Sequence, residues 1–247
     1  MRVNEHYTNE LRERFGYSAV WLPTTSIRPG DVGRMIGHQF ERLTSLDELG
    51  VPFECRAGES VGTLDYSSAS GVEISGGSKA SVAPASGGLA QADGLIKVRF
   101  AGEGAVVFRA EDCTSISIDP QQTLEAEILR RFAAGDWPTD HVVVTEVIRS
   151  GRTTILISGG RDASVELGGA ADTPMALTSA TMKVINSRNI STQIVAAGDL
   201  TPLFRAKGVR KRLLRGPEIV TRGGPGAPTA EPESPIYLGE VDYFHFS

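Results

Sequence analysis

Hydrophobicity with a period of two residues is the feature that most constrains the fold of this chain. In the stretch LIKVRFAGEGAVVFRA, Ile96, Val98 and Phe100 alternate with basic side chains, and the Gly-Glu-Gly sequence at 102–104 separates two such runs. Strands that are buried on one face alternate in this way, and glycines permit the tight turns between them. The pattern predicts a β-hairpin over residues 96–110 with one apolar face.

A second hairpin is predicted over residues 142–158, VVVTEVIRSGRTTILIS, with its turn at 150–151. Further strands are predicted in SATMKVINSRNISTQIV and in LTPLFRAKGVRKRLL. Helical spacing and end signals predict short helical segments at EHYTNELRERFGY, VGRMIGHQFERL, SLDELG and PQQTLEAEILRRFAAGDW. We therefore expect an α+β fold, in which a twisted, mainly antiparallel sheet with long hairpins is flanked by several short helices, with a short C-terminal tail packed on the body.

Charge and composition exclude some partners. The formal net charge is −5 and the pI is about 5.5, so no nucleic-acid partner is expected. The first residues lack the apolar core of a signal peptide, and no run of about 18 apolar residues occurs. We expect the intact protein to be cytoplasmic. Cys55 and Cys113 have neither disulfide-framework nor zinc spacing, and both are expected to be buried thiols.

The sequence contains no recognisable catalytic constellation. His6, His38, His141 and His245 are scattered without metal-ligand spacing. The GGSKAS stretch lacks the spacing of a phosphate-binding loop, and no GxSxG sequence occurs. The chain is therefore expected to have no catalytic residue, metal or cofactor, and not to be an enzyme.

A basic run and an acidic tail are electrostatic complements within the one chain. The basic run consists of Arg205, Lys207, Arg210, Lys211, Arg212 and Arg215. The tail carries Glu231, Glu233, Glu240 and Asp242 and has no basic residue. The basic run either protects a solvated strand edge or attracts the acidic tail or an anionic membrane surface.

Three segments resemble the bacterial gasdermins. These are RFGYSAVWLPTTSIRPGDV near the start, DHVVVTEVIRSGRTTILIS in the second predicted hairpin, and TPLFRAKGV in a late strand. A short aromatic tail that follows a Gly/Pro-rich linker is also similar to that family. By eye, the resemblance covers most of the chain.

The resemblance implies a pore-forming domain over 1–215, a cleavable linker over 216–235 and an autoinhibitory tail over 236–247. It implies a monomer that is activated when a caspase-like or trypsin-like protease cuts the linker. The cut protein would then oligomerise, bind membrane lipid and insert β-hairpins into the bacterial inner membrane, causing cell death in anti-phage defence. Members of the family often carry an acylated N-terminal cysteine, whereas the first cysteine of this chain is Cys55.

The tail is expected to pack on the sheet and to cover an edge or an apolar patch that oligomerisation needs. Its apolar residues are Ile236, Tyr237, Leu238, Val241, Tyr243, Phe244 and Phe246. Burying each such side chain contributes roughly 1.5–3 kcal/mol, and cutting the linker would remove the high effective concentration of the tethered tail. Arg222 is the first candidate cleavage residue and Arg215 the second. The candidate membrane-inserting residues are Ile96, Val98, Phe100, Val106, Phe108, Val142, Val144, Ile155 and Ile157.

Two alternatives remain open on the sequence alone. The tail could be an ordinary last strand, so that its removal only destabilises the protein. The chain could also be a non-enzymatic ligand-binding or interaction module that uses the Gly/Ser-rich region at 58–94 as a binding loop. That second alternative predicts a preformed concave pocket and no effect on membranes.

Overall fold

The computed structural model describes residues 3–22, 24–68, 71–78, 94–169, 177–211 and 236–240, with the backbone alone at 77–78, 210–211 and 236–240. Within these ranges the chain forms two helices and twelve strands. They are α1 (Val3–Phe15), β1 (Ser18–Ala19), β2 (Asp31–Ile36), β3 (Gln39–Ser45), β4 (Cys55–Ser67), β5 (Val72–Ser78), β6 (Gly94–Phe100), β7 (Val106–Ile118), α2 (Gln121–Ala134), β8 (Val142–Ser158), β9 (Ala163–Gly169), β10 (Lys183–Arg188), β11 (Ile190–Lys211) and β12 (Ile236–Glu240). The described strand pairs are antiparallel, which confirms the predicted α+β fold class.

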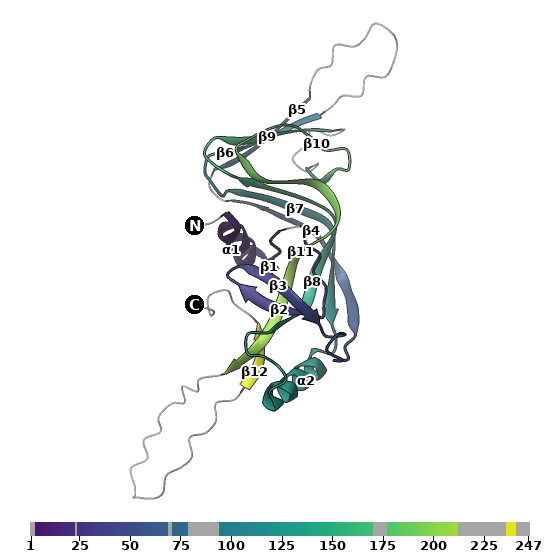
Figure 1. Cartoon of the computed structure of the whole chain (residues 1–247). Coiled ribbons are helices and arrows are strands. Elements are labelled where there is room, and N and C mark those ends of the chain that lie inside the picture. The colour runs from purple at the N-terminus through teal and green to yellow at the C-terminus, as the bar shows by residue number, and fades with distance from the viewer. Residues whose placement is uncertain are drawn as a thin grey trace, which may run out of the picture.

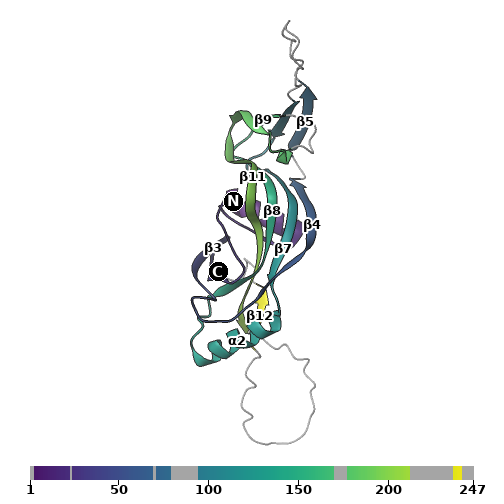
Figure 2. The same ribbon diagram turned by 90° about the vertical axis from the view of Figure 1, so that its right-hand side faces the viewer.

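Strand β8 is the centre of the larger sheet, sheet A. β11 pairs with one edge of β8 along its whole length, while β7 pairs with most of the other edge and β2 with its first two residues. β4 extends the sheet beyond β7, β3 extends it beyond β2, and β1 and β12 lie along the outer edge of β11. The sheet is strongly curved, with α1 on its concave side and α2 close to β12 (Figures 1 and 2).

Sheet B is smaller and has the strand order β10-β9-β6-β5. It packs against the end of sheet A that is far from α2 (Figure 1). The core between the two sheets joins Ile96, Val98 and Phe100 of β6 to Val107 of β7 and Leu156 of β8. The hairpin predicted over 96–110 is therefore wrong, because β6 and β7 belong to different sheets. Alternation shows that a strand has one buried face, but it does not show which strand lies beside it.

The turn predicted at 150–151 is also wrong, since β8 runs through it as one strand of 17 residues. Gly151 allows β7 to approach closely, because a Cβ at this position would lie 2.9 Å from Cβ of Asp112. Gly62 of β4 pairs with Cys113, the neighbour of Asp112 in β7, and Asp112 lies against Gly151 of β8. The pairs on either side of Gly151 bring it level with Asp199 of β11. Gly62, Asp112 and Asp199 have positive φ angles, so three of the four strands are irregular at about this level, which we call the bend row.

Two helical predictions are confirmed and one is wrong. α1 ends at Gly16, and α2 ends at Gly135 in the left-handed conformation that favours glycine. The segment VGRMIGHQFERL forms the β2–β3 hairpin instead of a helix, because Gly37 takes a positive φ in the two-residue turn between the strands. Residues 46–50 form a turn.

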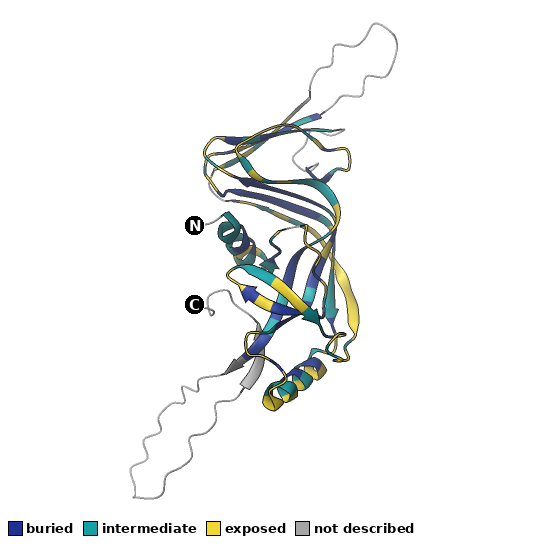
Figure 3. Ribbon diagram, in the orientation of Figure 1, coloured by how far each residue is buried: buried dark blue, intermediate teal, exposed yellow. Residues whose placement is uncertain are grey.

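The packed core reaches both faces of β8. Residues of β8 belong to four apolar clusters, which lie under α1, under sheet B, beside β2 and under α2. Figure 3 shows this buried centre as a dark blue band that runs along the middle strands. Cys113 is buried as expected, but Cys55 is exposed because it lies on β4, where nearly every residue faces solvent.

Replacing Gly151 by valine should destabilise the protein. The new side chain would meet the Asp112 side chain within the paired β7–β8 backbone, and such overpacking costs about 1–3 kcal/mol. Gly102→Ala is the matched control, because a Cβ at Gly102 meets open space. Urea denaturation of both variants measures the difference. Equal stability of Gly151→Val and the wild type would show that the bend row tolerates a side chain.

Glu127 of α2 should titrate far below an ordinary glutamate. Hydrogen bonds from Arg130 and Arg131, at 2.7–2.8 Å, lower its pKa from 4.5 to about 2. The pKa is depressed in the folded state, so the resulting stabilisation is complete above the unfolded-state pKa and is lost as the pH falls through about 2. Carboxyl NMR titration measures this value. In the Arg130→Gln/Arg131→Gln variant the pKa of Glu127 should rise, and an unchanged pKa would contradict this cause.

Candidate functional site: the outer edge of strand β11

The described part of the C-terminal tail is a strand on the edge of sheet A. β12 pairs antiparallel with β11, with Ile236 opposite Lys211, Tyr237 opposite Arg210, and Leu238 opposite Val209. In Figure 1, β12 lies beside the lower end of β11, next to α2. The tail therefore covers backbone N–H and C=O groups of β11 that would otherwise form an open sheet edge.

The register brings an acidic tail residue opposite the basic run. Glu240 is the Cα partner of Lys207, and directly opposed residues of an antiparallel pair lie on the same face of the sheet. Lys207 is partly buried. Opposite charges at such positions contribute about 0.2–1 kcal/mol. Arg205, also in β11, has a different partner, Glu146 of β8. Of the remaining basic residues, Arg210 and Lys211 have a described backbone in β11, whereas Arg212 and Arg215 lie outside the described residues.

Other predicted site residues also lie outside the described residues. They are the candidate cleavage residue Arg222 and the tail residues Val241, Tyr243, Phe244 and Phe246. The linker 216–235 is likewise outside them.

A second strand shares this edge with β12. β1 pairs with Leu203 and Phe204, so the two strands cover the edge on either side of Arg205 and Ala206. Both run antiparallel to β11 and therefore point in the same direction along it. Val20 extends the contact, because its N–H donates to the carbonyl of Pro202 at 2.9 Å.

A polar cluster holds β1 at this edge. The Tyr17 hydroxyl donates to Oε1 of Glu146 at 2.8 Å, and Nη1 of Arg205 donates to Oε2 of the same carboxylate at 3.2 Å. The guanidinium of Arg205 also stacks on the Tyr17 ring, 4.1 Å from its centroid. We call Tyr17, Glu146 and Arg205 the clasp. It joins the residue before β1 to the two central strands β8 and β11.

Helix α1 covers an apolar face of sheet A. Tyr7 and Leu11 of the helix are fully buried. Beneath them lie four of the candidate inserting residues, all buried: Val106, Phe108, Ile155 and Ile157. Phe15 contacts Phe108 ring to ring at 5.8 Å, and Glu10 accepts a 2.7 Å hydrogen bond from Ser68.

The other candidate inserting residues face different parts of the core. Ile96, Val98 and Phe100 lie between the two sheets. Val142 and Val144 pack with Phe204 and Met35. The nine residues therefore form three separate buried groups, and only the group under α1 combines β7 with β8.

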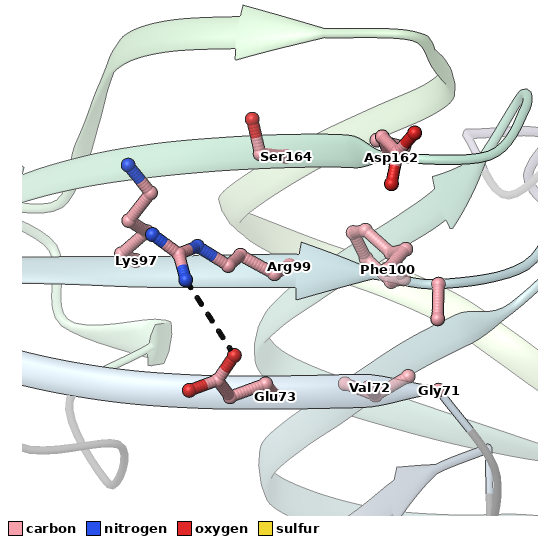
Figure 4. Close-up of a pocket in the computed structure, with 10 residues that line it drawn as sticks. Gly71, Val72, Glu73, Lys97, Arg99, Phe100, Asp162 and Ser164 are labelled. Atoms are coloured by element: carbon pink, nitrogen blue, oxygen red, sulfur yellow. Dashed lines mark ion pairs between the residues drawn. The ribbon is translucent and has the colours of Figure 1, made fainter.

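A surface groove of about 530 Å³ lies over β5, β6 and β9 (Figure 4). Lys97 and Arg99 rise from β6, and Nζ of Lys97 binds Oε1 of Glu166 at 2.6 Å. Arg99 lies 3.8 Å from Glu73. The two basic side chains of this groove thus face acidic side chains on neighbouring strands, and Asp162 also lines the groove.

Neither helix in the described ranges has the length and apolar character needed to cross a membrane. In the same part of the chain, no group of three His, Cys, Asp or Glu side chains is placed to hold a metal ion.

Comparisons with known proteins show a likeness to solved structures but not to a family model or a curated sequence. No protein-family model matches the sequence, and no curated protein matches it. Among solved structures, the chain matches a cryo-EM structure of the gasdermin A3 membrane pore, at 11% sequence identity and a TM-score of 0.36. The match covers 90% of this chain and 96% of the pore subunit.

Sequence reasoning missed the roles of α1, β1 and the clasp. Glu146 was visible only as an acidic residue that interrupts an apolar strand. An acidic residue in a run of otherwise buried positions indicates a charged partner nearby, because a buried carboxylate without such a partner is unfavourable. That partner, Arg205, was assigned to the basic run, and the sequence gives no indication that Tyr17 completes the cluster.

Exchanging the charges at positions 207 and 240 tests the register of the tail strand. Lys207→Glu places two acids opposite each other and should weaken β12 pairing, so that those amides of residues 207–211 that point toward β12 exchange faster with solvent. Adding Glu240→Lys should restore protection, with a coupling free energy of about 0.2–1 kcal/mol. Hydrogen exchange by NMR measures both. If the double variant exchanges as fast as Lys207→Glu, the two side chains do not interact.

Proposed function

We propose that this chain is a non-enzymatic pore-forming protein whose C-terminal tail holds it inactive. The observation that carries this proposal is the pairing of β12 with the outer edge of β11. An open strand edge is a template for pairing with another chain, and proteins cover such edges to prevent association. A strand that arrives through a long linker covers the edge only as long as the linker is intact.

The short length of β12 supports the proposal that it can leave the edge of β11. β12 pairs with only five residues of β11, over 207–211. While it is tethered, its effective concentration at the edge is high, and cutting the linker would remove that advantage without changing any contact. The vacated edge of β11 would then be open to a second copy of the chain, so the intact monomer would become an oligomer.

The buried face under α1 supports membrane insertion. Val106, Phe108, Ile155 and Ile157 are fully buried, and exposing each to water would cost roughly 1.5–3 kcal/mol. If α1 moves away, these side chains require another apolar environment, which lipid supplies. A strand of about 9–11 residues crosses the hydrocarbon core, and β7, β8 and β11 have 13, 17 and 22 residues. In this proposal β7, β8 and β11 are the inserting strands.

The proposed activating event is a cut in the linker 216–235. Arg222 is the preferred site and Arg215 the second, for a trypsin-like or caspase-like protease. Consistent with the resemblance in the sequence, we place the intact protein in the cytoplasm and the active oligomer in the bacterial inner membrane. The outcome would be cell death in anti-phage defence.

A second candidate function is an interaction module in which β12 is only a structural strand. The groove over β5, β6 and β9 favours it, because it is concave and adjoins the Gly/Ser-rich region. Both basic side chains of the groove already face acidic partners, so we rank this candidate second.

Dye release from vesicles of bacterial lipid tests the proposed function. A recognition site for a specific protease is placed between Arg222 and Pro228, and intact and cut protein are added at equal concentrations. The cut protein should release dye and the intact protein should not. A version with a scrambled recognition site, incubated with the same protease, is the control.

The two candidate functions give different results in this experiment. Cut protein that releases no dye, yet melts at a lower temperature than the intact protein, would reduce β12 to a structural strand. Equal release by intact and cut protein would exclude the tail as the inhibitor.

A further inference from the structure

The N-terminal segment, residues 3–19, covers the same sheet at two places. β1 occupies the β11 edge at Leu203 and Phe204, and α1 covers the apolar face formed by β7 and β8. β12 touches neither of these places, because its pairing ends at Lys207. Removing β12 therefore leaves the edge partly closed and the apolar face covered.

We propose that this N-terminal segment is a second lock, held by the clasp, which must leave sheet A after the tail has been removed. This inference rests on the proposed pore-forming function and describes its regulation. In the resulting order, cutting the linker opens residues 207–211 of the edge. Release of β1 and α1 then opens 203–204 and uncovers Val106, Phe108, Ile155 and Ile157.

The position and burial of the clasp support this role. Arg205 lies in the two-residue gap of the β11 edge between β1 and β12. Its partner Glu146 is 15% exposed and accepts hydrogen bonds from both Tyr17 and Arg205. The carboxylate of Glu146 therefore connects the N-terminal segment to β8 and β11, at the point of the β11 edge where β1 ends and β12 begins. Nε of Arg205 adds a long contact of 3.4 Å to the carbonyl of Gly16, at the end of α1.

The same two strands provide a matched control. Arg149 of β8 binds Asp199 of β11 at 3.0 Å, but both side chains are more than half exposed. This ion pair joins the same two strands as the clasp, but it includes no residue of the N-terminal segment or of β12. Arg149→Gln should therefore leave the release of the N-terminal segment, measured as amide exchange at Val20, unchanged.

Tyr17→Phe tests the clasp while keeping the aromatic ring. Loss of the hydrogen bond to Glu146 should speed amide exchange at Val20 about tenfold, as expected for one hydrogen bond to a charged group. After linker cleavage, the lag before dye release should shorten by a similar factor. Without cleavage, no dye should be released, because β12 still covers its part of the edge. Unchanged exchange at Val20 and an unchanged lag would show that the clasp does not hold the segment.

A reversible disulfide tests whether the segment must leave. Ala19 and Leu203 are opposed Cα partners, so Ala19→Cys with Leu203→Cys can form a bond across the edge. Cys55→Ser removes the exposed thiol. After cleavage, the oxidised protein should release no dye, and reducing agent should restore release to the same sample.

The outcomes separate the second lock from the pore itself. Dye release by the cut, oxidised protein would overturn the second lock and leave the pore-forming function intact. No release by the cut wild type would overturn the pore-forming function, and the second lock with it. Thermal unfolding of the reduced double-cysteine protein establishes that it is folded before these results are compared.

Discussion

Strand β8 is hydrogen bonded along both edges and buried on both faces, and the other layers of the molecule depend on it. It contributes residues to all four apolar clusters, so α1, sheet B, β2 and the layer that contains α2 each pack against a part of the same strand. Its exposed residues are Arg149 and Gly151, close to the middle of the strand. A displacement of β8 at one end would therefore disturb the packing of more than one of these layers.

The two outer edges of sheet A are protected in different ways. Within the described residues, β4 pairs only with β7, and its pairing shifts register at three places between Ala57 and Leu64. Irregular pairing of this kind makes an edge a poor template for another strand, and this protection is permanent. The outer edge of β11 instead relies on two short strands from distant parts of the chain. That protection is lost when either strand leaves.

Local signals in the sequence predicted most of the strands, and the ends of both helices, because a period of two and terminal glycines act within a few residues. They did not predict which strands are neighbours. Gly102 and Gly104 were interpreted as a hairpin turn, but they connect two sheets, and Gly151 was interpreted as a turn, but it lies inside a strand. The VGRMIGHQFERL segment was assigned to a helix because Asp31 follows a Pro-Gly turn and can act as an N-cap.

In the candidate site too, the sequence does not show which distant residues come together. The charges of the basic run and of the tail predicted that they would face each other, and the register places Glu240 opposite Lys207. The clasp depends on Tyr17, Glu146 and Arg205, which come from three segments far apart in the sequence. No periodicity connects such residues, so only the folded chain brings them together.

The bend row links the curvature of sheet A to the backbone conformation of several neighbouring strands. Asp112 and Asp199 hold left-handed backbone angles that cost roughly 1–2 kcal/mol each relative to extended ones. They lie at about the level of Gly62 and Gly151, where the pairing of β4 with β7 shifts register. A flat form of the sheet would require these positions to change together, because each strand is tied to the next on both sides of the row. The curvature of sheet A thus depends jointly on four segments that are far apart in the sequence.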